Sequence, residues 1–237
     1  MKNLKLKILL LAAICLTACK KEQPGINPRP SGPLTVVILG SSTAEGTGAN
    51  PPDSAWARRL DAAVNKASIK VKFVNLAFGG YSTYEVSPTG SPVVAGRPVP
   101  DTGRNVTKAL SYNPALVIIS LPSNDIAFNY SDGEILNNYA KITHALELAK
   151  VPYIIFSTQP RDFTDLNERM RLKTINDKIK AVYTYHVNDF LDQLSTSTYS
   201  INPLYEAGDG IHINDAGHMV IFNATIKQSV FISAIPH

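Results

Sequence analysis

Residue types that together activate a nucleophile occur at two distant places in this chain. Ser42 follows the first run of β-forming residues, and Asp209 and His212 lie three residues apart near the C-terminus. A serine hydroxyl is a weak nucleophile until an imidazole accepts its proton, and a carboxylate on the other ring nitrogen fixes the tautomer of that imidazole. One tight turn brings Asp209 to His212, so the fold has to deliver only Ser42. The pattern predicts a catalytic triad.

The elements that must position these residues alternate along the chain. We predict strands at 34–39, 71–76, 115–121 and 151–157, and helices at 54–67, 104–112, 133–150, 165–183 and 215–234. We predict that Ser54 caps the first helix and Asn214 the last. The strand segments are almost continuously apolar, which is typical of a parallel sheet covered on both faces. The sequence therefore predicts an α/β fold, a three-layer α/β/α sandwich with a mostly parallel central sheet.

Small and polar residues follow three of the predicted strands. Gly40-Ser41-Ser42-Thr43 follows the first strand, Gly79-Gly80 the second, and Ser123-Asn124-Asp125 the third. Ligands of such sheets bind at the carboxyl ends of the strands. We therefore expect all three loops to face one crevice.

Four blocks in this order resemble the SGNH, or GDSL-type, hydrolase superfamily. Ser42, Gly80 and Asn124 match the first three blocks, and Asp209-Gly-Ile-His212 matches the last, so that the resemblance covers 34–237. It implies a flavodoxin-like fold and a serine esterase without a cofactor, in which Ser42 is the nucleophile, His212 the base and Asp209 its partner. It also implies an oxyanion hole made of the Ser42 and Gly80 backbone amides and the Asn124 side-chain amide.

Two residues depart from the family pattern. Ser41 stands where the first block commonly has Asp, and Pro122 stands where the third block commonly has Gly. Ser41 therefore remains an alternative nucleophile, although Ser42 occupies the family position of the serine. The α/β-hydrolase elbow Gly-x-Ser-x-Gly is a poorer match, because Ala44 replaces its last glycine and the serine follows the first strand.

Asp209, His212, Asp215 and His218 raise the alternative of a metal site. Their types and three-residue spacing suit zinc or manganese. However, Gly208 and Gly210 place Asp209 in a turn before the last predicted helix. We therefore interpret Asp215 as a first-turn acid and His218 as a surface histidine, and we predict no metal.

The first residues are typical of an export signal. Lys2, Lys5 and Lys7 precede an apolar run from Ile8 to Ala18, which is too short to span a bilayer. The closing Leu16-Thr17-Ala18-Cys19 resembles the lipobox of bacterial lipoproteins. It implies a signal peptide at 1–18, a lipidated Cys19, a flexible tether at 19–33, a hydrolase domain at 34–237, and a lipid-anchored protein of the bacterial cell envelope. An ordinary cleaved signal is the alternative.

Composition limits the partners. The only two cysteines are Cys15, inside the predicted signal, and Cys19, so none remains for disulfides. The formal charge of +4 includes three lysines of that signal, and without them 20 basic side chains face 19 acidic ones. This balance gives no indication of a nucleic-acid partner, and it leaves the oligomeric state open.

Envelope location and the resemblance together favour a glycan ester as substrate, with removal of short acyl groups such as acetyl. The alternatives are a lysophospholipase or thioesterase for longer chains, and a catalytically silent glycan-binding protein. A proline-rich segment, 81–104, is interpreted either as a wall of the crevice or as a surface insertion. Tyr84, Arg97 and Arg161 are weak candidates for substrate contacts.

Overall fold

The computed structural model describes residues 33–66 and 70–235. The predicted signal segment 1–18, Cys19 and nearly all of the predicted tether lie outside the described residues.

A five-stranded sheet forms the centre of this domain. All neighbouring strands pair in parallel, in the order β2-β1-β3-β4-β5. The strands are β1 (Leu34–Gly40), β2 (Val71–Asn75), β3 (Leu116–Ser120), β4 (Tyr153–Phe156) and β5 (Val187–Asn188). This is the strand order of flavodoxin-like sheets, in which the chain changes direction between β1 and β3. The predicted fold class is confirmed.

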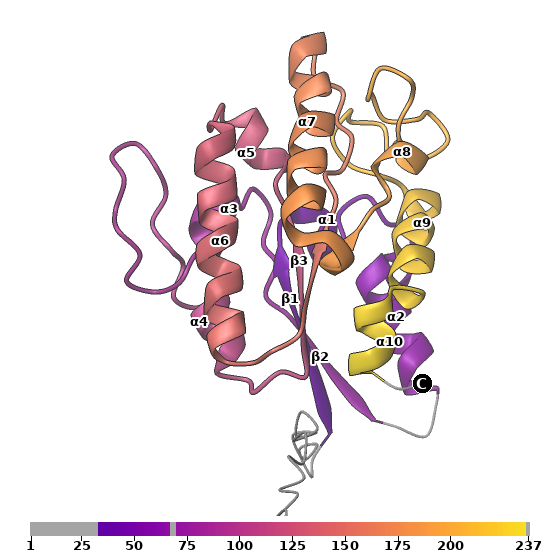
Figure 1. Cartoon of the computed structure of the whole chain (residues 1–237). Coiled ribbons are helices and arrows are strands. Elements are labelled where there is room, and N and C mark those ends of the chain that lie inside the picture. Colours follow the sequence, from indigo (N-terminus) through magenta and orange to yellow (C-terminus); the bar gives the residue numbers. More distant parts are fainter. Residues whose placement is uncertain (1–32, 67–69, 236–237) are drawn as a thin grey trace, which may run out of the picture. The chain divides into compact units, whose positions relative to one another are not determined.

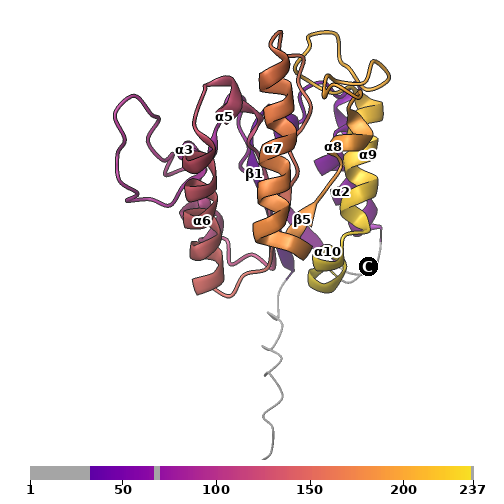
Figure 2. The same cartoon turned by 45° about the horizontal axis from the view of Figure 1, so that its top comes forward.

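Helices cover both faces of the sheet (Figures 1 and 2). One layer consists of α3 (Thr83–Val86), α4 (Val106–Leu110), α6 (Asp132–Leu148) and α7 (Leu166–Tyr183), and the other of α2 (Trp56–Asn65), α8 (Leu191–Leu194), α9 (Asp215–Ile226) and α10 (Ser229–Ala234). Shorter turns are α1 (Ser42–Glu45), α5 (Ser123–Ala127) and the 3-10 helices Pro52–Ser54 and Thr184–His186. No helix in the described ranges is both long and apolar enough to span a bilayer.

The strand side chains explain the two layers. In β1, Val37 and Leu39 pack with the α4, α6 and α7 layer, whereas Val36 and Ile38 pack with the α2 and α9 layer. All four are fully buried. Successive strand side chains point to opposite faces, so a strand buried on both sides has to be apolar throughout. The continuous apolar runs of the sequence follow from this architecture.

Two of the predicted helix ends differ from the structure. The predicted helix 215–234 is divided, because the Gln228 side chain accepts the amide hydrogens of Val230 and Phe231 and thereby begins α10. Ser54 does not cap α2, since it lies in a 3-10 turn and its hydroxyl donates to the Pro51 carbonyl. Asn214 caps α9 as predicted, and its side chain accepts the amide hydrogens of Ala216 and Gly217.

Candidate active site

Ser42 is the first residue of α1, directly after the carboxyl end of β1. The strand ends in Gly40, where an added Cβ would lie 2.7 Å from both the Ser120 carbonyl oxygen and the Ala44 Cβ. Only glycine allows this close approach of the two strand ends, and the approach sets the position of the turn that carries Ser42. Ser42 is therefore half-buried at the carboxyl ends of the neighbouring strands β1 and β3.

The C-terminal loop brings His212 and Asp209 to this serine. His212 Nε2 lies 2.8 Å from Ser42 Oγ, and His212 Nδ1 lies 2.6 Å from Asp209 Oδ2. The second carboxylate oxygen, Oδ1, accepts the backbone N–H groups of Ile211 and His212 at 2.9 and 2.8 Å. One carboxylate thus shapes the turn and holds the ring. This arrangement can move a proton from a hydroxyl to an imidazole.

The same contacts determine the ionisation of Asp209. Partial burial raises the pKa of this carboxyl, but hydrogen bonds from the His212 ring, the His212 amide and the Ile211 amide outweigh burial and lower the pKa to about 2. The side chain is 48% exposed, so water shares in the stabilisation. Asp209 therefore stays anionic at neutral pH, next to the His212 ring.

The turn that holds Asp209 depends on its neighbours. Gly208 and Gly210 adopt φ values of +104° and +69°, and both of their amides donate to Glu206 Oε1. Residues with a side chain rarely adopt such a φ, which explains the glycine on each side of Asp209. Gly48 allows the loop after Ser42 to pack against the same turn, since a Cβ there would lie 2.1 Å from the Ile213 carbonyl oxygen.

His218 is a structural residue and not the surface histidine that we predicted. It is fully buried, its Nδ1 accepts the Trp56 N–H at 3.3 Å, and its Nε2 lies 3.1 Å from the Thr47 carbonyl oxygen. Burial lowers its pKa to about 4, so the ring is neutral at physiological pH. It connects α9 to α2 and to the loop that follows Ser42.

The four residues of the alternative metal site are used separately. Asp209 and His212 face Ser42, Asp215 is the first-turn acid of α9 as predicted, and His218 is enclosed by backbone groups. Within the described ranges, no three His, Cys, Asp or Glu side chains are grouped as a metal ion would require. The arrangement favours proton transfer over metal binding.

A cavity of about 380 Å³ opens beside Ser42 and His212. It is lined by Ser42, Thr47, Gly79, Gly80, Asn124, Phe128, Arg161, Ile211 and His212. The three loops that follow β1, β2 and β3 thus meet here together with the C-terminal loop. Ser41 is buried elsewhere, in a small cavity lined by hydroxyl groups, and His212 contacts only the Ser42 hydroxyl of the two.

Hydrogen-bond donors are available around the Ser42 hydroxyl. The amides of Ser42 and Gly80 have no acceptor within the described part of the chain, whereas the Gly79 amide donates to Glu45 Oε2 at 2.8 Å. Gly80 has a φ of +83°, and a Cβ there would meet nothing within 4 Å. Its backbone conformation, and not crowding, therefore explains the glycine.

The Asn124 side chain is fixed at both ends. Its Nδ2 donates to the Tyr81 carbonyl oxygen at 2.9 Å, and its Oδ1 accepts from Arg161 Nη1 at 3.2 Å. An amide nitrogen carries two hydrogens, so one donor remains for a ligand in the cavity. Sequence reasoning found Asn124 but neither of the groups that orient it.

Asp125 is a residue of this site that sequence reasoning missed. It is fully buried beneath Asn124, and its carboxylate accepts the Thr83 hydroxyl at 2.5 Å and the Thr83 amide at 3.1 Å. Burial raises its pKa to about 7, although the Thr83 hydrogen bonds oppose this effect. Its position beside Asn124 was the only signal in the sequence.

Of the three weak candidates for substrate contacts, only Arg161 lines the cavity. Arg97 forms a 2.6 Å ion pair with Glu134, and the Tyr84 hydroxyl donates to the same carboxylate at 2.9 Å. The lining of the cavity includes no residue of 81–104, which favours the interpretation of that segment as a surface insertion. In Figure 1 its loop projects beyond α3 and α6.

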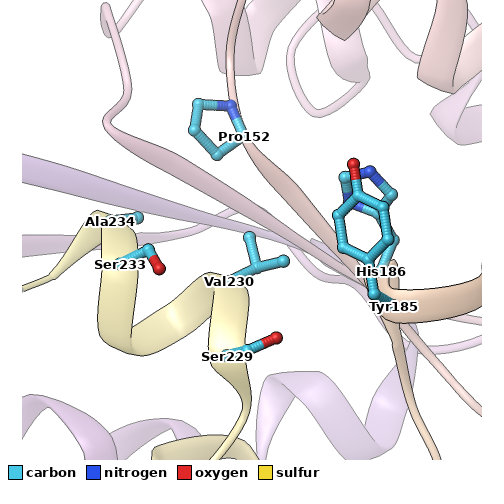
Figure 3. A pocket seen from close by; sticks show the side chains of 7 residues that line it. All are labelled: Pro152, Tyr185, His186, Ser229, Val230, Ser233 and Ala234. Carbon is cyan, nitrogen blue, oxygen red and sulfur yellow. The ribbon is translucent and has the colours of Figure 1, made fainter. Parts of the chain in front are cut away.

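A second cavity, of about 420 Å³, lies at the amino ends of β4 and β5 (Figure 3). It is lined by Pro152, Tyr185, His186, Ser229, Val230, Ser233 and Ala234. It also contains serines and a histidine, but His186 Nδ1 lies 2.9 Å from the Tyr153 carbonyl oxygen and no serine hydroxyl contacts the ring. This cavity has no activated nucleophile among the described residues.

Comparison with known proteins gives a family match. Residues 38–220 match the model of the GDSL-like lipase/acylhydrolase family. No curated protein matches the chain.

Several solved structures resemble the chain in fold. A psychrotrophic esterase from a Pseudoalteromonas species, solved with monoethylphosphonate as inhibitor, is 15% identical over 82% of this chain and 95% of its own, with a TM-score of 0.60. A GDSL-like lipase from Bacteroides thetaiotaomicron is 18% identical over 84% and 88%, with a TM-score of 0.62. A two-domain esterase active on acetylated mannans is 17% identical over 86% of this chain and 50% of its own, with a TM-score of 0.54. At these identities the likeness concerns the fold.

Proposed function

The chain belongs to the GDSL-like lipase/acylhydrolase family and acts on esters, and on that premise we propose that Ser42 forms a covalent acyl-enzyme. The observation that carries this proposal is the pair of contacts at His212, 2.8 Å to Ser42 Oγ and 2.6 Å to Asp209 Oδ2. These contacts match a serine that is activated by an imidazole, which a carboxylate orients in turn.

In the first half of the reaction, Ser42 Oγ attacks the carbonyl carbon of the ester while its proton passes to His212 Nε2. The tetrahedral intermediate then collapses, and the leaving alcohol takes that proton from His212. In the second half, a water molecule gives its proton to His212 and attacks the acyl carbon, and the collapse of this intermediate returns the proton to Ser42. Asp209, with its pKa of about 2, stays anionic and stabilises the imidazolium in both halves.

Three donors are proposed to hold the negatively charged oxygen of the tetrahedral intermediates. They are the free backbone amides of Ser42 and Gly80 and the remaining N–H of the Asn124 amide. The contacts of Asn124 with Tyr81 and Arg161 fix its orientation before the reaction. Donors that are already oriented need no rearrangement in the transition state, and each is worth roughly 3 to 4 kcal/mol of barrier.

We propose short acyl groups, such as acetyl, on a carbohydrate as the substrate. Among the lining residues, only Phe128 and Ile211 present large apolar side chains. A long acyl chain gains about 0.8 kcal/mol for each buried CH₂, so a site for it requires a longer apolar wall. A two-domain esterase that resembles this chain in fold is active on acetylated mannans, which supports this proposal.

Phosphonate labelling tests the identity of the nucleophile. We expect a fluorophosphonate probe to modify the peptide that contains Ser42, and the Ser42→Ala variant to remain unlabelled. The matched control is Ser41→Ala, which leaves the contact between His212 and Ser42 in place and is expected to retain labelling. Modification of Ser41 or of another residue would overturn the assignment.

A chain-length series tests the substrate class. We expect p-nitrophenyl acetate and butyrate to be hydrolysed with higher kcat/KM than the decanoate and longer esters. A maximum at long chains would favour the lysophospholipase or thioesterase alternative. Equal inactivity of wild type and Ser42→Ala on all esters, together with retained glycan binding, would favour a silent glycan-binding protein.

We further propose that Cys19 carries a lipid anchor and that the enzyme acts in the bacterial cell envelope. The proposal rests on Leu16-Thr17-Ala18-Cys19 after a short apolar run. Several acyl chains on one cysteine give stable attachment where a single chain does not. Growth with an alkyne fatty acid should label wild type and not Cys19→Ser, and labelling that survives this substitution would contradict the anchor.

A further inference from the structure

Arg161 is a cation inside the catalytic cavity that has no carboxylate partner. It lines the same cavity as Ser42 and His212, and no Asp or Glu oxygen of the described residues lies within 4.0 Å of its guanidinium nitrogens. Two other partly buried arginines are paired, Arg97 with Glu134 at 2.6 Å and Arg171 with Asp132 at 2.8 Å. Arg59, Arg104 and Arg169 also form no ion pair among the described residues, but they donate to neutral oxygens outside this cavity, so the position beside Ser42 and His212 is what distinguishes Arg161.

The guanidinium is held in place by neutral groups. Its Nη1 donates to Asn124 Oδ1 at 3.2 Å, and its central carbon lies 5.2 Å from the centre of the Phe163 ring. Arginine has five N–H donors in a planar fork, and this is its only hydrogen bond to a described residue. The other donors are therefore available to a ligand or to water.

Arg161 stays positively charged, and no ion pair with a described residue neutralises it. Burial lowers its pKa, and the more distant charges of Asp209 and Glu168 oppose that effect without forming an ion pair. An arginine remains protonated under such conditions, because its intrinsic pKa is above 12. A positive charge that has lost part of its water is thus directed at the place where the ester binds.

We propose that Arg161 binds an anionic group of the substrate next to the ester bond, and that the preferred substrates are short-chain esters of acidic sugars. A planar guanidinium matches the two oxygens of a carboxylate, and such charge-assisted pairs are stronger than neutral hydrogen bonds. The half-exposed Phe128 ring in the same cavity provides an apolar surface for a sugar ring. This inference rests on the proposed ester hydrolysis and names its substrate class.

Arg161 also orients Asn124, so an experiment has to separate recognition from positioning. Matched probes are 3-carboxyphenyl acetate and its neutral analogue 3-carbamoylphenyl acetate, which share the acyl group and the ring. We expect wild type to prefer the carboxylate probe by about tenfold or more in kcat/KM, as is typical of hydrogen bonds between charged groups. Arg161→Gln should reduce this preference to near one, mainly through KM, and Arg161→Lys should retain part of it.

The outcomes distinguish this inference from the proposed function. If Arg161→Gln lowers kcat equally for both probes and leaves their ratio unchanged, Arg161 only positions Asn124 and the inference is wrong. The inference is equally wrong if the wild-type preference is near one, or if a phosphorylated phenyl acetate is preferred over the carboxylate, which would indicate a phospholipid-like substrate. Failure of the proposed function would appear differently, as inactivity of wild type toward every probe and loss of fluorophosphonate labelling.

Three further measurements complete the design. Arg58→Gln removes a side chain that is 64% exposed and lies outside the cavity, and it should leave the preference unchanged. Fluorophosphonate labelling of Arg161→Gln shows whether the Ser42 site is still folded and reactive. Higher ionic strength should reduce the wild-type preference and leave the neutral probe unaffected, because salt screens exposed charge pairs.

Discussion

The two cavities at opposite edges of the sheet contain similar residue types and differ in what those residues contact. Each includes serine and histidine, and the cavity at the amino ends of the strands has the larger volume, about 420 Å³ against about 380 Å³. At the carboxyl ends, the imidazole of His212 lies between a hydroxyl and a carboxylate. At the amino ends, the His186 ring stacks on Tyr153 at 4.2 Å and bonds to a backbone carbonyl. Composition and volume therefore do not identify a site.

The difference follows from the parallel sheet. β1, β2 and β3 all end at the same edge of the sheet. The turns that follow them therefore bring backbone amides and the Asn124 side chain together there without long loops. At the opposite edge, the loops enter strands that pair with their neighbours, and α10 contributes only Ser229, Val230, Ser233 and Ala234, none of which contacts the His186 ring. The cavity at the carboxyl ends thus has free donors, and it is there that negative charge can be stabilised.

The largest expected effect is the loss of the proposed nucleophile. Ser42→Ala should reduce kcat by roughly 10⁵-fold or more, because no other hydroxyl of the described residues contacts His212. The measurement is steady-state hydrolysis of p-nitrophenyl acetate by purified protein. Ser233→Ala is the matched control at the other cavity and should retain wild-type activity, and a comparable loss there would remove the distinction between the two cavities.

The next largest effect is the loss of the carboxylate that orients His212. Asp209→Asn keeps an oxygen that can accept the Ile211 and His212 amides, but it places an N–H donor where the second carboxylate oxygen accepts from the His212 ring. We expect kcat to fall by roughly 10³- to 10⁴-fold. Asp215→Asn is the control, since this exposed acid belongs to the next helix and does not contact His212. Equal effects of the two substitutions would mean that general charge, and not the 2.6 Å contact, supports the reaction.

The sequence predicted these residues because each of them follows a strand or lies in a short turn. The strands at 34–39, 71–76, 115–121 and 151–157 are mostly apolar, and β1 and β3 are buried almost throughout, so that pattern locates their carboxyl ends to within a residue or two. Local signals also predicted Asn214 as a helix cap, and they placed Asp209 and His212 in one turn. Features that depend on a few neighbouring residues can be read from the chain.

Features that depend on distant partners could not be predicted in this way. His218 was interpreted as a surface residue, because nothing near it shows that the Trp56 amide, 162 residues away, donates to its ring. The Tyr81 and Arg161 contacts of Asn124 join loops that follow different strands. The division of the last helix is different, because it depends on a local cap at Gln228 that the prediction of one helix over 215–234 missed.

A smaller effect concerns the buried carboxyl of Asp125, next to Asn124 in the chain. Burial raises the pKa of Asp125 in the folded protein from the ordinary 3.8 to about 7, so between these values the folded protein binds a proton that the unfolded chain has released. The free energy of unfolding should therefore decrease as pH rises from about 4 to 7, by up to about 4 kcal/mol from this group. Urea unfolding across this range should show that the stability of wild type falls relative to that of Asp125→Asn as pH rises.

His218 has to be considered in the same experiment. Burial lowers its pKa in the folded protein from the ordinary 6.5 to about 4, so the unfolded chain binds the additional proton between these values and this group makes stability increase with pH. Because both variants contain His218, their difference isolates Asp125. Parallel curves for wild type and Asp125→Asn would show that the Thr83 hydrogen bonds keep the carboxyl ionised, with its pKa below that range.

The smallest expected effect is at the cavity of the amino edge. Ser233→Trp places a large ring in a space that already exists, next to Tyr185 and His186, and it removes no hydrogen bond between Ser42 and His212. We expect kcat/KM for p-nitrophenyl acetate to stay within about twofold of wild type, since substitutions that share no partners act independently. A thermal melt provides the control for folding. A large loss of activity at unchanged melting temperature would show that the two edges of the sheet are coupled, and the carboxyl-edge site would then not be self-contained.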